Sequence, residues 1–320
     1  MNQRITPLEI GPLTLDAQTT HNVSTLGKAC ADHDGDPPFS DQTLVQLRSA
    51  PDTVTITGVR VRATQEIVGA AVVVHSPASE ESRDDPPHAV LEAALAPQHR
   101  GHGAGRALIT QAVRATEAHN TPLDAWAHGD HPAARAIAQH LGFTPVRELH
   151  RLLRPLTGVR QELVAALPED LALRPFAIGR DESAWLEVNA AAFANHPEQG
   201  RMSLTDLQER QTEDWFDPQG FLIAHPVDDP DTIVGFHWTK VHPATDHDPA
   251  RGEVHVVGVA PEHQGRGLGK ALTVAGLHHL AARDLTEALL YVDADNSAAF
   301  ALYRSLGFTP WHVDVMFHRD

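Results

Sequence analysis

The stretch 253-EVHVVGVAPEHQGRGLGKALTVAGLHHL-280 decides the fold. A valine-rich run typical of a strand is followed by an Ala-Pro turn, a glycine-rich loop and a helix with apolar side chains at i, i+3, i+4 and i+7. An earlier stretch, 89-AVLEAALAPQHRGHGAGRALITQAVRAT-116, repeats this order. We therefore expect the same strand, loop and helix to occur twice.

Two separated matches support an internal duplication. Aligning Gly103 with Gly267 gives an offset of 164 residues, and aligning 141-LGFTP-145 with 306-LGFTP-310 gives 165. A single-residue insertion reconciles the offsets, and 320 residues suit two domains with a core each. We predict an N-terminal domain over 1–155, a linker over 156–170 and a C-terminal domain over 171–320.

Composition excludes several classes of partner. The net charge of −17 argues against binding to nucleic acid or to an anionic membrane. No apolar run is long enough to span a bilayer, and the first residues lack the features of a secretory signal, so we expect a cytoplasmic protein. Cys30 is the lone cysteine and has acidic neighbours, which disfavour a reactive thiolate. The 22 histidines, including His128 and His131, lack a familiar zinc spacing, so we expect no metal.

The glycine loop 264-QGRGLG-269 indicates a phosphate site. Alternating glycines let backbone N–H groups face one point, and the following helix adds positive potential at its N-terminus. A glycine loop alone does not separate this site from dinucleotide-binding or kinase loops.

The surrounding letters resemble the pyrophosphate loop of the GNAT acetyltransferases. Their pattern V-x-V-x-P-x-x-[QR]-x-x-G-x-[GA] is similar to 257-VGVAPEHQGRGLG-269 and to 93-AALAPQHRGHGAG-105. The resemblance implies two tandem GNAT domains of the α/β (α+β) class, each a central mixed sheet flanked by helices. It also implies acetyl-CoA as co-substrate.

The resemblance assigns cofactor contacts to both copies. In the second copy these residues are Val257, Gly258, Val259, Gln264, Gly265, Arg266, Gly267, Leu268, Gly269, Lys270, Asn296, Ser297, Ala298, Ala299, Phe300 and Ala301. In the first copy they are Ala93, Ala94, Leu95, Gly101, His102, Gly103, Ala104, Gly105 and Arg106.

Only the second copy carries groups that can move protons. Glu253 begins the strand that leads into the loop, where a carboxylate can act on a bound amine through water. By resemblance, Tyr303 is the acid for the leaving thiolate and Asn296 opens the helix that binds pantetheine. The first-copy counterparts of Glu253, Asn296 and Tyr303 are Ala89, His131 and Ala138. We therefore expect the first copy to bind the nucleotide without turning it over, or to serve as a scaffold.

Nearly the whole chain resembles one branch of the family, the actinobacterial tandem GNAT enzymes of mycothiol biosynthesis. The resemblance rests on 196-HPEQG-200, 235-GFHWTKVHP-243, 253-EVHVVGV-259, 264-QGRGLG-269 and 289-LLYVDADN-296. It implies N-acetylation of the cysteinyl amine of Cys-GlcN-inositol, the last step of that pathway.

The same resemblance implies which residues contact the acceptor. Glu198, Lys240 and Glu253 bind it, and Tyr291 lines its pocket. Asp41 stands where the family usually has a Glu, so its carboxylate is one carbon shorter.

Two alternatives stay open at this point. One is a GNAT enzyme that acetylates another small amine or a peptide N-terminus, and the other is a non-enzymatic acyl-CoA sensor. The expected partner is a small molecule, with no nucleic acid and no membrane, and the expected state is a monomer.

Overall fold

The computed structural model describes residues 7–76, 88–117, 121–194, 199–244 and 249–320. The chain forms two compact units. Unit 1 comprises the described residues up to Leu149 together with His312–Asp320, and unit 2 comprises His150–Trp311.

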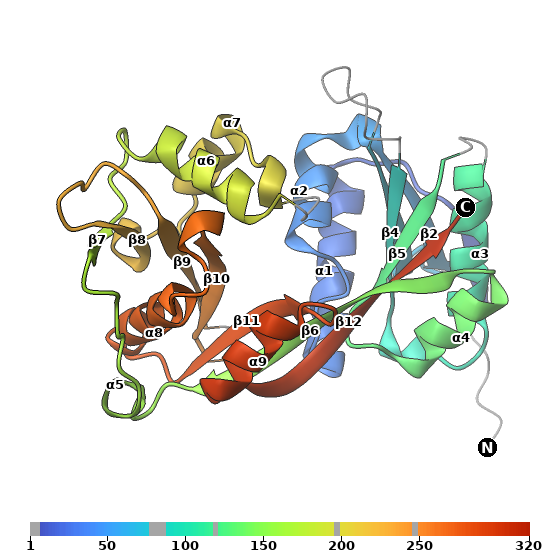
Figure 1. Cartoon of the computed structure of the whole chain (residues 1–320). Helices are drawn as coiled ribbons and strands as arrows, with labels where there is room; N and C mark the ends of the chain where they lie inside the picture. Colours follow the sequence, from blue (N-terminus) through green and yellow to red (C-terminus); the bar gives the residue numbers. More distant parts are fainter. Residues whose placement is uncertain (1–6, 77–87, 118–120, 195–198, 245–248) are drawn as a thin grey trace. The chain divides into compact units, whose positions relative to one another are not determined.

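Unit 1 is built on a sheet with the strand order β1-β2-β3-β4-β5-β12 (Figure 1). Its neighbouring strands are antiparallel except β4 and β5, which are parallel and are joined by a crossover through α3. Its elements are β1 (Leu8–Pro12), α1 (Ala17–Asp34), α2 (Asp41–Ser49), β2 (Val54–Val61), β3 (Ile67–Ser76), β4 (His88–Leu95), α3 (Ala104–Glu117), β5 (Leu123–Ala127), α4 (Pro132–His140), the first part of β6 (Thr144–Pro155) and the last part of β12 (Thr309–Arg319).

Unit 2 repeats this plan with the strand order β6-β11-β10-β9-β8-β7. Its parallel pair is β10 and β11, and α8 makes the crossover. Its elements are α5 (Val159–Glu162), β7 (Leu171–Pro175), α6 (Glu182–Ala192), α7 (Leu204–Gln211), β8 (Phe221–Pro226), β9 (Gly235–His242), β10 (Arg251–Val259), α8 (Leu268–Ala281), β11 (Glu287–Asp293) and α9 (Ser297–Ser305). The predicted fold class, two mixed sheets flanked by helices, is confirmed.

The last strand of each repeat joins the sheet formed by the other repeat. At the offset of 165, β6 corresponds to β12. The end of β12 pairs antiparallel with β5, with Val315 opposite Ala127, and β6 is the neighbour of β11. The compact units therefore do not follow the chain consecutively, and the boundaries at residues 155 and 170 stay a prediction.

Helices cover both faces of the unit 2 sheet. His237 and Trp238 are consecutive on β9 and point to opposite faces. His237 Nδ1 donates to the Leu272 carbonyl of α8 at 2.8 Å, whereas Trp238 packs against Trp185 of α6 with ring centroids 5.8 Å apart. Trp185 and Trp238 are fully buried, and burial of large apolar side chains stabilises a fold by about 1.5–3 kcal/mol each. The core thus fixes β9 and β10 between two helical layers.

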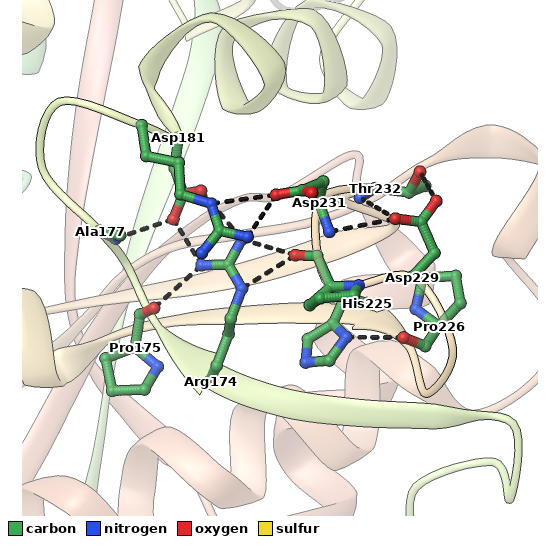
Figure 2. A network of polar contacts seen from close by, with 11 residues as sticks. Arg174, Pro175, Ala177, Asp181, His225, Pro226, Asp229, Asp231 and Thr232 are labelled. Atoms are coloured by element: carbon green, nitrogen blue, oxygen red, sulfur yellow. Dashed lines mark hydrogen bonds and ion pairs between the residues drawn. The ribbon is translucent and has the colours of Figure 1, made fainter.

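Arg174 ties the edge strand β7 to the start of α6 (Figure 2). Its Nη1 and Nη2 donate to the Asp181 carboxylate at 2.5 and 2.9 Å, and its Nε and Nη2 donate to the Pro230 carbonyl at 3.1 and 3.0 Å. Burial of the Asp181 carboxyl opposes its ionisation, but hydrogen bonds from Arg174 and from the Ala177 N–H outweigh this and hold its pKa below the usual range. One guanidinium therefore joins β7, α6 and the β8–β9 turn.

Replacement of Arg174 by Met should weaken unit 2 strongly. The change leaves the Asp181 carboxylate, whose side chain is 3% exposed, without its charged partner. We expect the free energy of unfolding to fall by about 3–5 kcal/mol, measured by urea denaturation followed through tryptophan fluorescence.

Arg180→Met is the matched control, because it breaks an ion pair with Asp231 in which the side chains are 49% and 77% exposed. Its cost should stay below about 1 kcal/mol. Equal losses for the two variants would show that the Arg174 pair does not hold the unit together.

Candidate active site

The parallel pairing of β10 and β11 in unit 2 ends next to Glu253, the predicted base. We call the opening between the two strands beyond this point the fork. β10 pairs with β11 only from Gly252 to Val254, although β10 continues to Val259 and β11 to Asp293. On the other side, the register between β9 and β10 shifts between Val254 and Val256, so His255 sits at a bulge. The backbone beyond Val254 is thereby released from β11 at the point where a pantetheine arm is expected.

The glycine loop of unit 2 follows directly. Gly265 and Gly267 have φ of +76° and +80°, and no heavy atom lies within 4 Å of a Cβ built at either position. α8 begins at Leu268, so the loop ends at a helix N-terminus, and Lys270 lies in its first turn. Arg266 is engaged by Asp170, with Nη2 and Oδ1 2.6 Å apart, while Gln264 Nε2 donates to the Val259 carbonyl at 3.1 Å. The open, left-handed glycines and the helix end fit a bound pyrophosphate.

Glu253 is a buried carboxylate held between two imidazoles. His242 Nε2 lies 2.5 Å from Glu253 Oε2, and His255 Nδ1 lies 2.8 Å from Oε1. Burial opposes ionisation of Glu253, yet the charge of His255 and the hydrogen bonds from His242 and His255 outweigh it, so its pKa lies well below the usual range. The group predicted as the base is therefore a firmly held anion.

Lys240 lies directly opposite Glu253 in the β9–β10 register. Its Nζ stands over the Trp215 ring, 4.9 Å from the centroid. The same indole meets His255 edge to face, with centroids 5.3 Å apart. Lys240, Trp215, His255 and Glu253 thus form one continuous cluster, whose histidine and tryptophan were not predicted.

The remaining candidates of the second copy lie on β11 and α9. Tyr291 on β11 is 42% exposed. Asn296 caps α9, with its Oδ1 accepting from the Ala299 N–H at 3.1 Å. Tyr303 is half-buried against Phe308, and burial raises the pKa of its phenol to about 12. The predicted cofactor residues Ser297 to Ala301 form the first turns of α9.

Two further residues were predicted to contact the acceptor, and both roles stay predictions. Asp41 lies in unit 1, exposed in the first turn of α2. Glu198 lies outside the described residues, so its role stays a prediction.

The first copy has the same fork and the same loop. β4 pairs with β5 only from Ala89 to Leu91, and Gly101 and Gly103 have φ of +81° and +86°. A cavity of about 620 Å³ opens beside this loop, and most predicted cofactor residues of the first copy line it. They are Ala93, Ala94, Leu95, Gly101, Gly103, Gly105 and Arg106.

The proton-handling positions of the two copies differ as the sequence indicated. Ala89 is fully buried, Ala138 lines the cavity, and His131 opens α4 without a side-chain cap. Cys30 also lines the cavity, where burial raises the pKa of its thiol.

Unit 1 contains an ionic cluster that sequence reasoning missed. His128 lines the cavity with its Nε2 3.1 Å from Glu92 Oε1 and its Nδ1 3.5 Å from Asp314 Oδ2. Burial opposes protonation of the ring, but hydrogen bonds to Asp314 and Glu92 outweigh it and raise the pKa of His128 to about 9. Since Asp314 belongs to β12, the imidazolium bonds the exchanged strand to the unit 1 sheet.

Within the described ranges, no group of three or more His, Cys, Asp or Glu side chains is arranged to hold a metal ion. Among the same residues, no helix is long and apolar enough to cross a membrane.

The comparisons with known proteins define the class. The chain matches the model of the acetyltransferase (GNAT) family twice, over residues 25–143 and 185–308. A solved tandem GNAT protein from the clavulanic acid biosynthesis pathway has the same fold, with a TM-score of 0.71 at 21% identity over 98% of both chains. The fold and the paired glycine loops are those of a tandem GNAT acetyltransferase.

Two curated relatives narrow the class. A mycothiol acetyltransferase of Kocuria rhizophila is 53% identical over 287 residues, 89% of this chain and 90% of its own. One of Renibacterium salmoninarum is 45% identical over 317 residues, 97% of this chain and 90% of its own. The chain belongs to the mycothiol acetyltransferase family, so the predicted acyltransferase with an acyl-CoA donor and a small-molecule acceptor is confirmed over the non-enzymatic sensor.

The His128 cluster should make the stability of unit 1 depend on pH. The folded pKa of about 9 exceeds the ordinary value of 6.5, so the contribution is fully present below about pH 6.5 and is lost as the pH rises through 9. We expect the urea midpoint to fall between pH 6.5 and 9.5 and this fall to be smaller in His128→Asn.

His21→Asn, at an exposed position of α1, is the control and should keep the wild-type pH dependence. The same fall in His128→Asn as in the wild type would mean that another group is responsible.

Proposed function

We propose that this protein transfers the acetyl group of acetyl-CoA to the cysteinyl amine of Cys-GlcN-inositol, completing mycothiol. The observation that carries the proposal is the 53% identity to a mycothiol acetyltransferase over 89% of the chain. The cluster around Glu253 and Lys240 supports it, because an amine acceptor needs a group that takes up its proton.

The glycine loop of unit 2 is the proposed site for the pyrophosphate of acetyl-CoA. Gly265 and Gly267 leave the backbone open, and the N-terminus of α8 favours the phosphates. Val257, Gly258 and Val259 follow the fork between β10 and β11, where their backbone can pair with pantetheine. Asn296, already placed as the cap of α9, borders the other strand of the fork.

The reaction exchanges one bond for another. The ammonium loses a proton, the free amine attacks the thioester carbonyl carbon, the C–N bond forms and the C–S bond breaks. An α-amine has a reference pKa near 7.7, so a base of modest strength suffices near neutral pH. Because the acceptor also carries a thiol, positioning decides that nitrogen reacts.

Tyr303 is proposed to serve the leaving sulfur. With a pKa of about 12, its phenol stays protonated throughout the neutral range. That value lies well above the reference of about 8.5 for a thiol, so full transfer to the thiolate is unfavourable at rest. We assign Tyr303 to donate a hydrogen bond that strengthens as charge builds on the sulfur.

The first copy is proposed to bind an acyl-CoA without turning it over. It keeps the glycine loop and adds a cavity of about 620 Å³. It has alanine at the positions that correspond to Glu253 and Tyr303.

That the protein is a cytoplasmic monomer with no nucleic-acid or membrane partner stays a prediction.

The assignment of the acceptor is tested by incubating the protein with acetyl-CoA and a panel of amines and following CoA release. The panel holds Cys-GlcN-inositol, its des-cysteinyl amine, an aminoglycoside and a peptide with a free N-terminus. We expect turnover with Cys-GlcN-inositol and an N-acetyl product by mass spectrometry. Turnover of another amine with none of this acceptor would remove the assignment.

Paired substitutions in the two loops test which copy works. Gly267→Asp places a carboxylate against the pyrophosphate of unit 2, and we expect acetyl transfer to fall at least 100-fold. Gly103→Asp is the matched control, because Gly103 and Gly267 have similar φ of +86° and +80° and the same open space. It should keep the rate within about threefold while lowering the number of CoA molecules bound. An inactive, folded Gly103→Asp beside an active Gly267→Asp would reverse the assignment.

A further inference from the structure

We propose that His255, held by Glu253, is the group that takes the proton from the acceptor ammonium. The inference rests on the proposed function and deepens it, since it assigns the base to the bulge residue of β10. Glu253 becomes the positioning residue that acts through the ring.

The hydrogen bond between the two residues fixes the state of the imidazole. An ionised carboxylate only accepts hydrogen bonds, so His255 Nδ1 must carry the proton that it shares with Glu253 Oε1 at 2.8 Å. In the neutral ring, Nε2 then presents a lone pair. The arrangement orients a base through its second nitrogen, as an acidic partner does in other catalytic dyads.

Packing holds the ring in place. Its edge meets Trp215 and Trp238, with centroids 5.3 and 5.4 Å away and interplanar angles of 67° and 89°. The side chain of His255 is 24% exposed, whereas that of Glu253 is 7% exposed. An incoming amine can therefore reach the imidazole more readily than the carboxylate.

Position along β10 favours His255 over its neighbours. His255 lies two residues and Glu253 four residues before Val257, the first of the residues proposed to pair with pantetheine. At about 3.3 Å per residue these separations are roughly 7 and 13 Å along the strand. His242 pairs opposite Arg251, six residues or roughly 20 Å from Val257. His255 thus lies between Glu253 and the proposed pantetheine contact along β10, hydrogen-bonded to the carboxylate.

Other titratable and charged groups surround the His255 ring, although His237 lies on the opposite face of β9, against α8. His237 on β9 interacts with the ring electrostatically, but burial lowers the pKa of His237 to about 4, with the charges of His279 and His255 adding to the effect, so His237 is neutral under assay conditions. Lys240 Nζ stands over the Trp215 ring, and His242 shares the Glu253 carboxylate. The proton taken up by His255 can leave to water through its exposed edge.

The step balances in protons. The ammonium gives one proton to His255 Nε2, and the amine nitrogen then forms its bond to the carbonyl carbon. As the C–S bond breaks, the nitrogen releases its second proton to water, and the departing thiolate, hydrogen-bonded by Tyr303, takes up one proton from water. His255 returns its proton to solvent, so each turnover releases one proton.

The test compares His255→Asn, Glu253→Gln and His242→Asn in acetyl transfer to Cys-GlcN-inositol at saturating substrates from pH 5.5 to 9. We expect His255→Asn to lower kcat about 100-fold or more. We also expect it to lose the decrease in kcat that the wild type shows toward acidic pH, called here the acidic limb. Glu253→Gln should lower kcat but keep a limb, since the His255 imidazole is still present, and His242→Asn should also keep a limb. Deprotonation of the acceptor's own ammonium also makes kcat depend on pH, but this dependence is the same in all variants. Acetyl-CoA affinity and circular dichroism check folding.

Rescue of turnover by added imidazole distinguishes a base from a residue that only supports the structure. Added imidazole should restore turnover to His255→Ala in proportion to its free-base fraction and should leave Glu253→Ala unrescued. Wild-type kcat and limb in His255→Asn, or loss of the limb in Glu253→Gln alone, would overturn the inference and return the base to the carboxylate. Failure of the wild type to acetylate this acceptor would instead overturn the proposed function.

Discussion

The early end of the ladder between β10 and β11 is the constraint on which the site depends. Three residues of pairing suffice to align the strands, and the release that follows opens backbone groups to a ligand. The bulge at His255 lies on the other flank of β10, and the His255 imidazole is hydrogen-bonded there to the Glu253 carboxylate of the same strand. The glycine loop and the capped start of α9 then close the fork at its wide end.

The two copies show how one scaffold accommodates different chemistry. Both keep the fork and the left-handed glycines, because a sheet with a parallel crossover and a phosphate loop tolerates little change there. The side chains around the fork have diverged freely. Unit 2 places a carboxylate and two imidazoles on β9 and β10. At the offset of 164, unit 1 has Ala89 in place of Glu253 and Leu91 in place of His255, and it uses His128 to hold the final strand.

Much of the fold was predictable because its signals are local. Gly265 and Gly267, the Ala-Pro turn and the strand alternation each act over a few residues, and their repetition at one offset predicted two like units. The exchange of β6 and β12 was not predictable, since two similar strands carry no local mark of which sheet they join. The ionic cluster of Glu92, His128 and Asp314 was missed because the three residues are far apart in sequence. His255 could have been found, because residues two apart on a strand share a face with Glu253.

The exchanged strand also bears on how the chain is made. Val315 pairs with Ala127, so the edge of β5 stays unpaired until a segment 315 − 127 = 188 residues further along has been synthesised. At a synthesis rate of roughly 5–20 residues per second, that interval is on the order of 10–40 seconds, far longer than hairpin formation takes. During translation the edge of β5 is therefore an open template on which a strand of another chain can pair.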